Sequence, residues 1–215
     1  MFSEELKKIR LVPVVVIENA DLAAPLAEAI ATGGLHCVEI TLRTEEALGA
    51  IGTMAARADM LVGAGTVLNI EQARAAVDKG ARFIVSPGMS PSLVDWCLAR
   101  QVPVIPGCAT PTEIQLALEK GLDTVKFFPA EQLGGIKMLA TLAAVFQTVQ
   151  FMPTGGITPG NLPSYLALPQ VVACGGSWLV RTDWLRDKKF TDIREEIGKA
   201  VKLLDSASKG TEQAS

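Results

Sequence analysis

One lysine of this chain differs from the others because it lies inside an apolar, strand-like segment. Ten of the eleven lysines fall in helical or terminal charged stretches, whereas Lys126 lies in the segment Thr124 to Pro129. Side chains of a strand alternate between its two faces, so Thr124 and Lys126 should point into the interior. An amine among apolar side chains loses water, which favours the neutral form that attacks carbonyl groups. The alternative is a lysine that reaches solvent at the end of its strand.

A second strand-like segment, Cys37 to Leu42, carries a carboxylate and is followed by a guanidinium group. Its apolar positions should face helices, while Glu39, Thr41 and Arg43 should face the interior. An unpaired charge there is costly, so each charged group needs a partner or a substrate. One alternative is an internal ion pair between Glu39 and Arg43. The other is a site in which both groups meet a substrate.

Two glycine-rich turns follow the last two strand-like segments. The first contains Gly155 and Gly156, and the second contains Gly176 and Ser177. Glycines let backbone N–H groups approach an anion, and the loops after the last two strands of a barrel commonly hold phosphate. Simple tight turns would also use glycine, but the two turns together favour a phosphate site. A third turn carries the Thr66 hydroxyl, which either joins the site or caps the next helix.

Short apolar runs recur along the chain, and stretches rich in alanine, leucine and charged residues separate them. This alternation is typical of a parallel sheet with helices between its strands. The predicted strands are Val12 to Ile17, Cys37 to Leu42, Met60 to Gly65, Phe83 to Ser86, Val104 to Ile105, Thr124 to Phe127, Gln150 to Pro153 and Val171 to Cys174. The predicted helices include Ala20 to Ala31, Thr44 to Ala58, Ile70 to Lys79, Ser90 to Ala99, Thr112 to Lys120 and Ile136 to Val145.

The regular return of the strands predicts an α/β fold in which the sheet closes on itself. Strands recur at intervals of roughly 20 to 30 residues, and no G-x-G-x-x-G pattern follows the first one. We therefore expect a (β/α)8 TIM barrel rather than an open doubly wound sheet. A helix over Ser3 to Arg10 would cover the bottom of the barrel. We expect one domain over residues 1–204, with residues 205–215 forming a flexible tail.

Composition and charge argue against several classes of protein. Apolar residues make up 49% of the chain, which is enough for a large core. No apolar run reaches the roughly 18 residues of a membrane-spanning helix, so we expect no membrane partner. The net charge of -3 leaves no basic excess for nucleic acid. The N-terminus lacks the apolar core of a signal peptide, and the four cysteines form no C-x-x-C pair. We therefore expect reduced thiols and a cytoplasmic location.

Metal-dependent chemistry has little support in the sequence. The only histidine, His36, lies before the strand that carries Glu39, and no cluster of His, Asp and Glu converges on the strand ends. We therefore expect no metal ligand set and no Ser-His-Asp triad. No cofactor is expected either.

Six blocks of the sequence, in order and spanning nearly the whole chain, resemble one known family. They are residues 38–44 (VEITLRT), 63–67 (GAGTV), 86–88 (SPG), 106–113 (PGCATPTE), 125–131 (VKFFPAE) and 153–157 (PTGGI). Together they identify the chain as similar to the 2-keto-3-deoxy-6-phosphogluconate (KDPG) and 4-hydroxy-2-oxoglutarate (KHG) aldolases. The resemblance also implies a homotrimer, which composition could not indicate.

The resemblance implies a role for each matching residue. Lys126 corresponds to the Schiff-base lysine and Glu39 to the carboxylate that transfers protons. The remaining correspondences are Arg43 and Thr66 for the pyruvate carboxylate, Pro87 and Phe128 for the pocket lining, and Gly155, Gly156, Gly176 and Ser177 for the phosphate. Cys174, before the second glycine turn, has no interpretation on this basis.

These residues imply a metal-independent class I aldolase that cleaves KDPG into pyruvate and glyceraldehyde 3-phosphate. Because KHG lacks a phosphate, the glycine turns favour KDPG, with cleavage of KHG to pyruvate and glyoxylate as a second reaction. A phosphogalactonate-type aldolase would share the lysine and the glycines, but residues 41–44 resemble the gluconate type. Two other classes stay open, namely a phosphosugar isomerase or epimerase that uses Glu39 as a base, and a barrel that only binds a phosphorylated metabolite.

Overall fold

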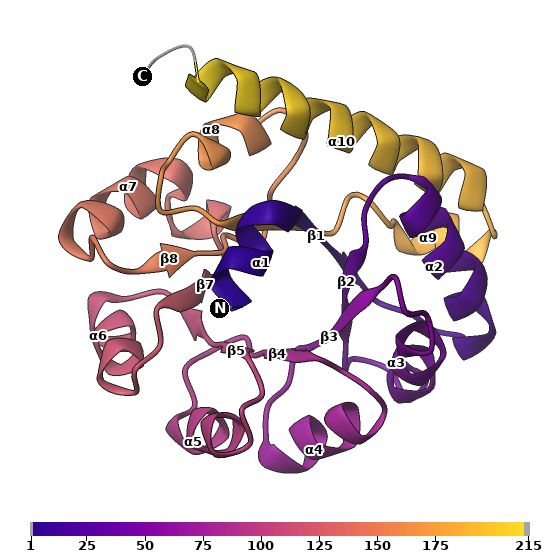
Figure 1. The fold of residues 1–215 in the computed structure, drawn as a ribbon, viewed down its shortest axis with the longest axis horizontal. Helices are drawn as coiled ribbons and strands as arrows, with labels where there is room; N and C mark the ends of the chain where they lie inside the picture. The colour runs from indigo at the N-terminus through magenta and orange to yellow at the C-terminus, as the bar shows by residue number, and fades with distance from the viewer. Residues whose placement is uncertain (1, 213–215) are drawn as a thin grey trace.

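The computed structural model describes residues 2–212, with side chains described as far as residue 205. Its short strands lie around a common centre, and most of the helices surround them (Figure 1). The strands are β1 (Arg10–Val15), β2 (Cys37–Thr41), β3 (Leu61–Gly65), β4 (Phe83–Val85), β5 (Val104–Ile105), β6 (Gly107–Cys108), β7 (Thr124–Phe127), β8 (Gln150–Phe151) and β9 (Ala173–Gly176). Every pairing between them is parallel.

The helices follow the strands in alternation. The α-helices are α1 (Phe2–Ile9), α2 (Ala23–Thr32), α3 (Ala47–Ala55), α4 (Ile70–Asp78), α5 (Pro91–Ala99), α6 (Pro111–Glu119), α7 (Gly135–Val145), α8 (Leu162–Leu166), α9 (Thr182–Arg186) and α10 (Phe190–Glu212). Two short 3-10 helices, η1 (Ala20–Leu22) and η2 (Glu131–Leu133), precede α2 and α7. All six helices named from the sequence between strands are present, with boundaries that differ by a few residues.

The strands form a curled parallel sheet in two hydrogen-bonded parts. One part has the order β5-β4-β3-β2-β1-β9, and the other has the order β6-β7-β8. Only Pro106 separates β5 from β6, and its carbonyl accepts a hydrogen bond of 2.9 Å from the backbone N–H of Lys126. Single bridges also join Phe151 to Val171 and Thr154 to Gly175. The α/β class and the parallel sheet expected from the sequence are confirmed.

All eight predicted strands overlap observed ones, although the first and the last are each displaced by two residues, and an additional short strand follows Pro106. β9 extends to Gly176, where it pairs with β1. A Cβ atom at Gly175 would lie 2.3 Å from Thr154 Oγ1, so glycine lets the neighbouring segments approach closely. β6 was not predicted. It forms because Gly107 follows the proline and pairs with Lys126 of β7.

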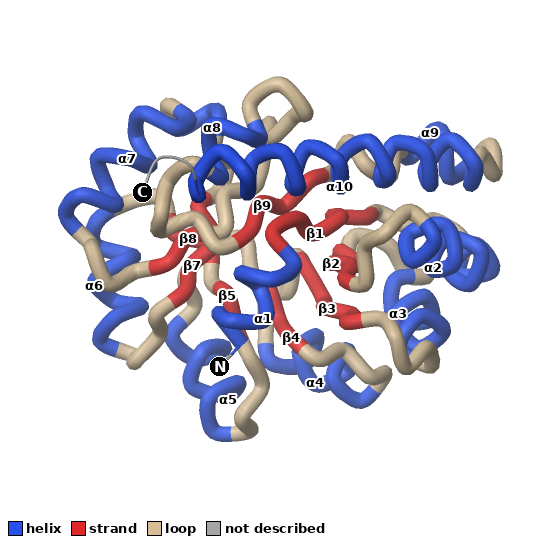
Figure 2. Tube along the Cα trace, turned by 45° about the horizontal axis from the view of Figure 1, so that its top comes forward, coloured by secondary structure: helices blue, strands red, loops and turns tan. Residues whose placement is uncertain are grey.

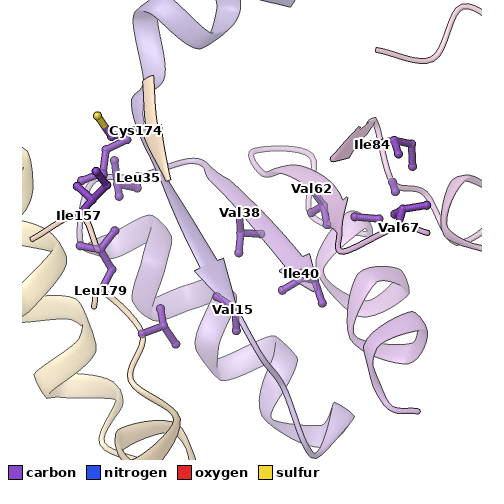
Figure 3. Packing of buried hydrophobic residues seen from close by; sticks show 14 of the residues in the cluster. Val15, Leu35, Val38, Ile40, Val62, Val67, Ile84, Ile157, Cys174 and Leu179 are labelled. Atoms are coloured by element: carbon purple, nitrogen blue, oxygen red, sulfur yellow. The ribbon is translucent and has the colours of Figure 1, made fainter. Parts of the chain in front are cut away.

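Two hydrophobic clusters lie on the two faces of the sheet. The larger cluster packs the outer face against the helices and includes Val38 and Ile40 of β2, as Figure 3 shows. The smaller cluster lies inside the curled sheet, where Leu6 of α1 packs with Val12 and Phe83. Helix α1 therefore lies across the centre of the ring of strands (Figure 1). Alternation along β2 thus separates residues that face the helices from residues that face the interior, as expected.

The C-terminal helix α10 packs against α2, α8 and α9 and runs along one side of the molecule (Figure 2). The guanidinium group of Arg10 donates a 2.9 Å hydrogen bond to the carbonyl of Leu204 on this helix. α10 continues to Glu212, so much of the segment expected to form a flexible tail is helical. Residues 213–215 lie outside the described part of the chain. The division into a domain of residues 1–204 and a tail stays a prediction.

Candidate active site

A cavity of about 140 Å³ lies at the carboxyl ends of the strands. Residues from or just after seven strands contribute to its wall. The lining consists of Val14, Val16, Glu39, Thr41, Arg43, Thr66, Pro87, Lys126, Phe128, Thr154, Gly155, Gly156, Ile157, Gly175 and Ser177. A hollow of about 230 Å³ near α1 is larger, but Asp123 is the only charged residue in its lining. The strand-end cavity is therefore the better candidate for chemistry.

Lys126 and Glu39 meet in this cavity from different strands. The ammonium group of Lys126 donates a 3.3 Å hydrogen bond to Glu39 Oε1. The two side chains are almost fully buried, with 6% and 0% of their surface exposed. Lys126 Nζ also lies 5.1 Å from the centre of the Phe128 ring, where the face of the ring attracts a cation. Lys126 does not reach solvent at its strand end, so that alternative is not observed.

The carboxylate of Glu39 has only one of its oxygens paired within the described part of the chain. Oε2 is buried and has no hydrogen-bond partner there. An unpaired buried acceptor is costly unless it has a use. Because this oxygen belongs to a residue that lines the cavity, it is available to accept a proton or a hydrogen bond from a bound molecule.

Gly65 of β3 creates the space that the Glu39 side chain occupies. A Cβ atom at this position would lie 2.0 Å from Glu39 Oε1 and 2.6 Å from the carboxyl carbon. Glycine at this position is therefore required by a long-range contact. The sequence pattern did not indicate this contact, because β2 and β3 are distant in sequence at these positions and their register is visible only in the fold.

Arg43 and Thr66 lie in the same cavity wall, as the sequence analysis expected. Glu39 pairs with Lys126, and no ion pair joins it to Arg43 in the described part of the chain. Arg43 is exposed, so its guanidinium group is free to meet an anion. Thr66 does not cap α4. That role belongs to Asn69, whose side chain accepts a 2.9 Å hydrogen bond from the backbone N–H of Gln72.

The turn after β8 has the open backbone that an anion site needs. Gly155 and Gly156 have φ angles of 98° and 79°, which L residues with side chains rarely adopt. The carbonyl of Gly155 accepts a 3.1 Å hydrogen bond from the backbone N–H of Glu131. Likewise, the backbone N–H of Thr154 donates to the carbonyl of Phe127 at 3.0 Å. This turn is therefore attached to the segment that begins at the end of β7.

All the predicted site residues except Gly176 line the cavity, and Pro87 and Ser177 are among them. Gly176 lies beside it within β9, where a Cβ atom would lie 2.3 Å from the ring of Trp178. Val14 and Val16 of the first strand segment also line the cavity, although the sequence analysis did not select them. Val14 and Val16 alternate along the chain with positions that face outward, and this alternation could have identified them as inward-facing.

No group of three or more His, Cys, Asp and Glu side chains suited to a metal ion occurs among the residues that the structure describes. His36 is exposed, and its Nδ1 atom lies 3.1 Å from the carbonyl of Asp59. The four cysteines are buried and unpaired with one another. Within the described range, no helix is long and apolar enough to span a membrane.

Comparison with known proteins identifies the family of this chain. The sequence model of the family described as KDPG and KHG aldolase matches residues 2–196. The chain belongs to this family. The KDPG and KHG aldolase membership inferred from the six sequence blocks is therefore confirmed.

Individual members of the family are similar to the chain over most of its length. It is 49% identical to the 2-dehydro-3-deoxy-phosphogluconate aldolase of Treponema pallidum (strain Nichols), across 88% of this chain and 91% of that protein. It is 43% identical to the KHG/KDPG aldolase of Escherichia coli (strain K12), across 89% and 90% of the two chains.

A solved structure of a family member gives a spatial comparison. The KDPG aldolase of Legionella pneumophila was solved with pyruvate captured at low pH as a covalent carbinolamine intermediate. Its TM-score to this chain is 0.90 at 38% identity, with 93% of this chain and 98% of that chain covered. A carbinolamine is the adduct of an amine and a carbonyl group.

Proposed function

We propose that this protein is a class I aldolase, a metal-independent carbon-carbon lyase, that cleaves KDPG into pyruvate and glyceraldehyde 3-phosphate. The observation that carries the proposal is the buried pair of Lys126 and Glu39 inside the strand-end cavity. An amine and a carboxylate 3.3 Å apart supply the nucleophile and the proton acceptor that Schiff-base chemistry requires. The isomerase and binding-barrel alternatives would leave this buried amine without a role.

The reaction begins at Lys126. After its ammonium group loses a proton, with Glu39 as the nearest base, Nζ adds to the C2 ketone of the substrate. Glu39 then gives that proton to the hydroxyl group of the carbinolamine, which leaves as water, so Glu39 is a carboxylate again and an iminium ion remains. The positive charge of the iminium accepts electrons from the neighbouring bond.

Glu39 then moves the second proton. Its carboxylate takes the proton of the C4 hydroxyl, directly or through one water, while the C3–C4 bond breaks. The electrons of that bond pass to C3 and the iminium, which forms an enamine, and the aldehyde is released. Glu39 returns a proton to C3, and water hydrolyses the resulting iminium to free pyruvate and Lys126.

Binding groups surround this centre. Arg43, with two parallel N–H donors, suits the carboxylate of the substrate better than lysine would, and the Thr66 hydroxyl lies in the same wall. Pro87 and Phe128 give the reacting end an apolar lining. The turn with Gly155 and Gly156, together with Gly176 at the end of β9 and Ser177 directly after it, offers backbone N–H groups and a hydroxyl to the phosphate. Because KHG lacks this phosphate, we infer that it is the poorer of two substrates.

We also infer that the two parts of the sheet form one closed (β/α)8 barrel whose bottom α1 covers. The bridges from Phe151 to Val171 and from Thr154 to Gly175 support closure on one side. The continuous backbone through Pro106, which pairs with β4 on one side and β7 on the other, supports it at the second junction. We propose a cytoplasmic location as well, which fits the four buried free thiols. Localisation of a fluorescent fusion would check it, and export would contradict it.

The proposed assembly is a homotrimer, as the family resemblance implies. The chain has a mass of 22.7 kDa, so light scattering of a homotrimer would give about three times this value. A particle of one or two chain masses across the working concentration range would contradict the trimer.

The deciding experiment traps the proposed adduct. The protein is incubated with pyruvate and borohydride, and its intact mass is measured beside that of Lys126→Ala. One reduced pyruvate per chain in the wild type, absent in the folded variant, is the expected result, with KDPG cleavage abolished in the variant. An unmodified wild-type protein, or substantial cleavage by Lys126→Ala, would favour an isomerase or a binding barrel.

A further inference from the structure

The segment after the Schiff-base strand contains a carboxylate that the reaction proposed above does not use. Glu131 lies five residues after Lys126, at the start of η2. Its Oε1 atom accepts a hydrogen bond from the hydroxyl of Tyr165, which is on α8. Tyr165 is the only tyrosine of the chain, and its side chain is fully buried. A buried tyrosine normally finds a partner for its hydroxyl, and here the partner is a charged group.

Glu131 lies directly against the glycine turn that we assign to the phosphate. Its Cβ and Cγ atoms would each lie 2.6 Å from a Cβ atom at Gly156, so the two residues are in close contact. Its backbone N–H donates to the carbonyl of Gly155 at 3.1 Å. A Cβ atom at Gly135 would lie 2.8 Å from Glu131 Oε1 and 3.3 Å from the Tyr165 hydroxyl. The carboxylate is thus held between the turn and the beginning of α7.

Helix α8 contacts the same turn from the other direction. Asn161, just before α8, donates a 3.0 Å hydrogen bond from Nδ2 to the carbonyl of Gly156. Its Oδ1 atom accepts from the backbone N–H of Thr158 at 2.8 Å. Because Tyr165 lies one helical turn after Asn161, a single short helix contacts the turn through Asn161 and Glu131 through Tyr165.

We propose that Glu131 and Tyr165 are positioning residues that hold the Gly155–Gly156 turn at a fixed place relative to Lys126. They thereby set the preference of the enzyme for phosphorylated over unphosphorylated keto acids. The proposal rests on the proposed function, since it concerns the phosphate end of that substrate. Neither side chain lines the cavity, so each acts through the backbone of the turn.

Near neutral pH the hydroxyl of Tyr165 carries its proton, which favours its hydrogen bond to Glu131. Burial, together with the hydrogen bond to Glu131, raises the pKa of the Tyr165 hydroxyl above its usual value. The hydroxyl therefore keeps its proton and remains a donor to the carboxylate. A donor held in this way restrains Glu131 without adding a second charge near the phosphate turn.

The test compares KDPG with KHG, because only KDPG carries a phosphate that uses the turn. Tyr165→Phe removes the hydroxyl and little else. We expect its ratio of kcat/KM for KDPG to kcat/KM for KHG to fall about tenfold, the size expected for loss of one hydrogen bond to a charged group. The change should appear mainly in KM for KDPG, and pyruvate trapping by borohydride should still give the adduct.

Further variants separate positioning from a general loss of structure. Glu131→Ala should lower the ratio at least as much as Tyr165→Phe, and the double variant should be no worse than Glu131→Ala, because both remove the same interaction. Glu131→Gln keeps an acceptor for the tyrosine and should restore the ratio to within about threefold of wild type. Glu28→Ala, which removes a surface ion pair with Arg57, serves as a Glu-to-Ala control and should leave the ratio unchanged.

Equal losses on both substrates in Tyr165→Phe or Glu131→Ala would overturn the proposal, because they would indicate only a structural role. An unchanged ratio in both variants would overturn it as well. If the proposed function itself is wrong, the wild-type protein will give neither the pyruvate adduct nor KDPG cleavage, so the two failures can be distinguished.

Discussion

A lysine and a glutamate that are both buried stabilise each other's charge, and each loses part of its solvation in doing so. Removing one partner of such a pair leaves an uncompensated buried group. In the reaction that we propose, the pair also controls catalysis, because the lysine must give up a proton before it attacks. The free Oε2 atom of Glu39 means that the carboxylate can hold Lys126 and still accept a substrate proton.

At the residue scale we predict that Glu39→Gln lowers kcat much more than it raises KM. The amide keeps the size of the carboxylate but is a poor base, and loss of a general base typically costs about 10²- to 10⁴-fold in rate. Steady-state kinetics on KDPG would check this, with pyruvate trapping to show that Lys126 still forms its adduct. A rise in KM with an unchanged kcat would indicate that Glu39 only positions the substrate.

At the scale of single elements, β2 and β3 show how a strand register decides whether the proposed catalytic carboxylate of Glu39 fits. Glu39 is opposite Gly63 in the pairing of the two strands, while Gly65 leaves room for its carboxylate. The same register brings Thr66, which follows β3, into the cavity wall with Arg43. The positions of three site residues therefore depend on one strand pair.

We predict that Gly65→Ala lowers kcat/KM strongly while the protein remains folded. The added methyl group would overlap Glu39 Oε1, and a displacement of a catalytic group by about 1 Å can cost about 100-fold in rate. Overpacking of this kind typically lowers the free energy of unfolding by about 1–3 kcal/mol. The measurements are kcat/KM on KDPG and chemical denaturation of the same sample.

Gly52→Ala is the matched control for this prediction. Gly52 lies within α3, and the nearest atom to a new Cβ would be Lys79 Cδ at 3.7 Å. Alanine should therefore leave activity unchanged and raise the stability of the helix by up to about 1 kcal/mol. Normal activity in Gly65→Ala would contradict the tight fit around Glu39.

At the scale of the whole molecule, the inner hydrophobic cluster joins α1 to the amino-terminal side of the sheet. Leu6 is fully buried there among side chains from several strands. The helix thus packs against the inner face of the sheet, whereas the cavity with Lys126 lies at the carboxyl ends of the strands. This separation allows one end of the sheet to contribute stability while the other end carries polar and charged groups.

We predict that Leu6→Ala lowers the free energy of unfolding by about 2–5 kcal/mol, the usual cost of removing a large side chain from a core. The folded variant should still form the pyruvate adduct, because the cavity is at the other end of the strands. Thermal or urea unfolding would measure the change. Val145→Ala is the control, since Val145 is 71% exposed and should matter little. A similar effect of both substitutions would contradict a role for α1 in closing the core.

The sequence alone determined the α/β class, the approximate strands and the faces of their side chains. Alternation along the strand identified Lys126 and Glu39 as inward-facing, and the glycine pairs marked an open turn. The reason is local, because the backbone itself imposes a period of two on a strand and makes glycine favourable at positive φ. These properties need no knowledge of distant parts of the chain.

Only the tertiary structure decided which inward-facing groups meet. Glu39 pairs with Lys126, which lies 87 residues away, rather than with the nearby Arg43. The contacts of Gly65 with Glu39 and of Tyr165 with Glu131 could not be predicted from the sequence either. The physical reason is that alternation specifies a face, whereas distances across the interior depend on the curvature of the sheet and on the register of all its strands.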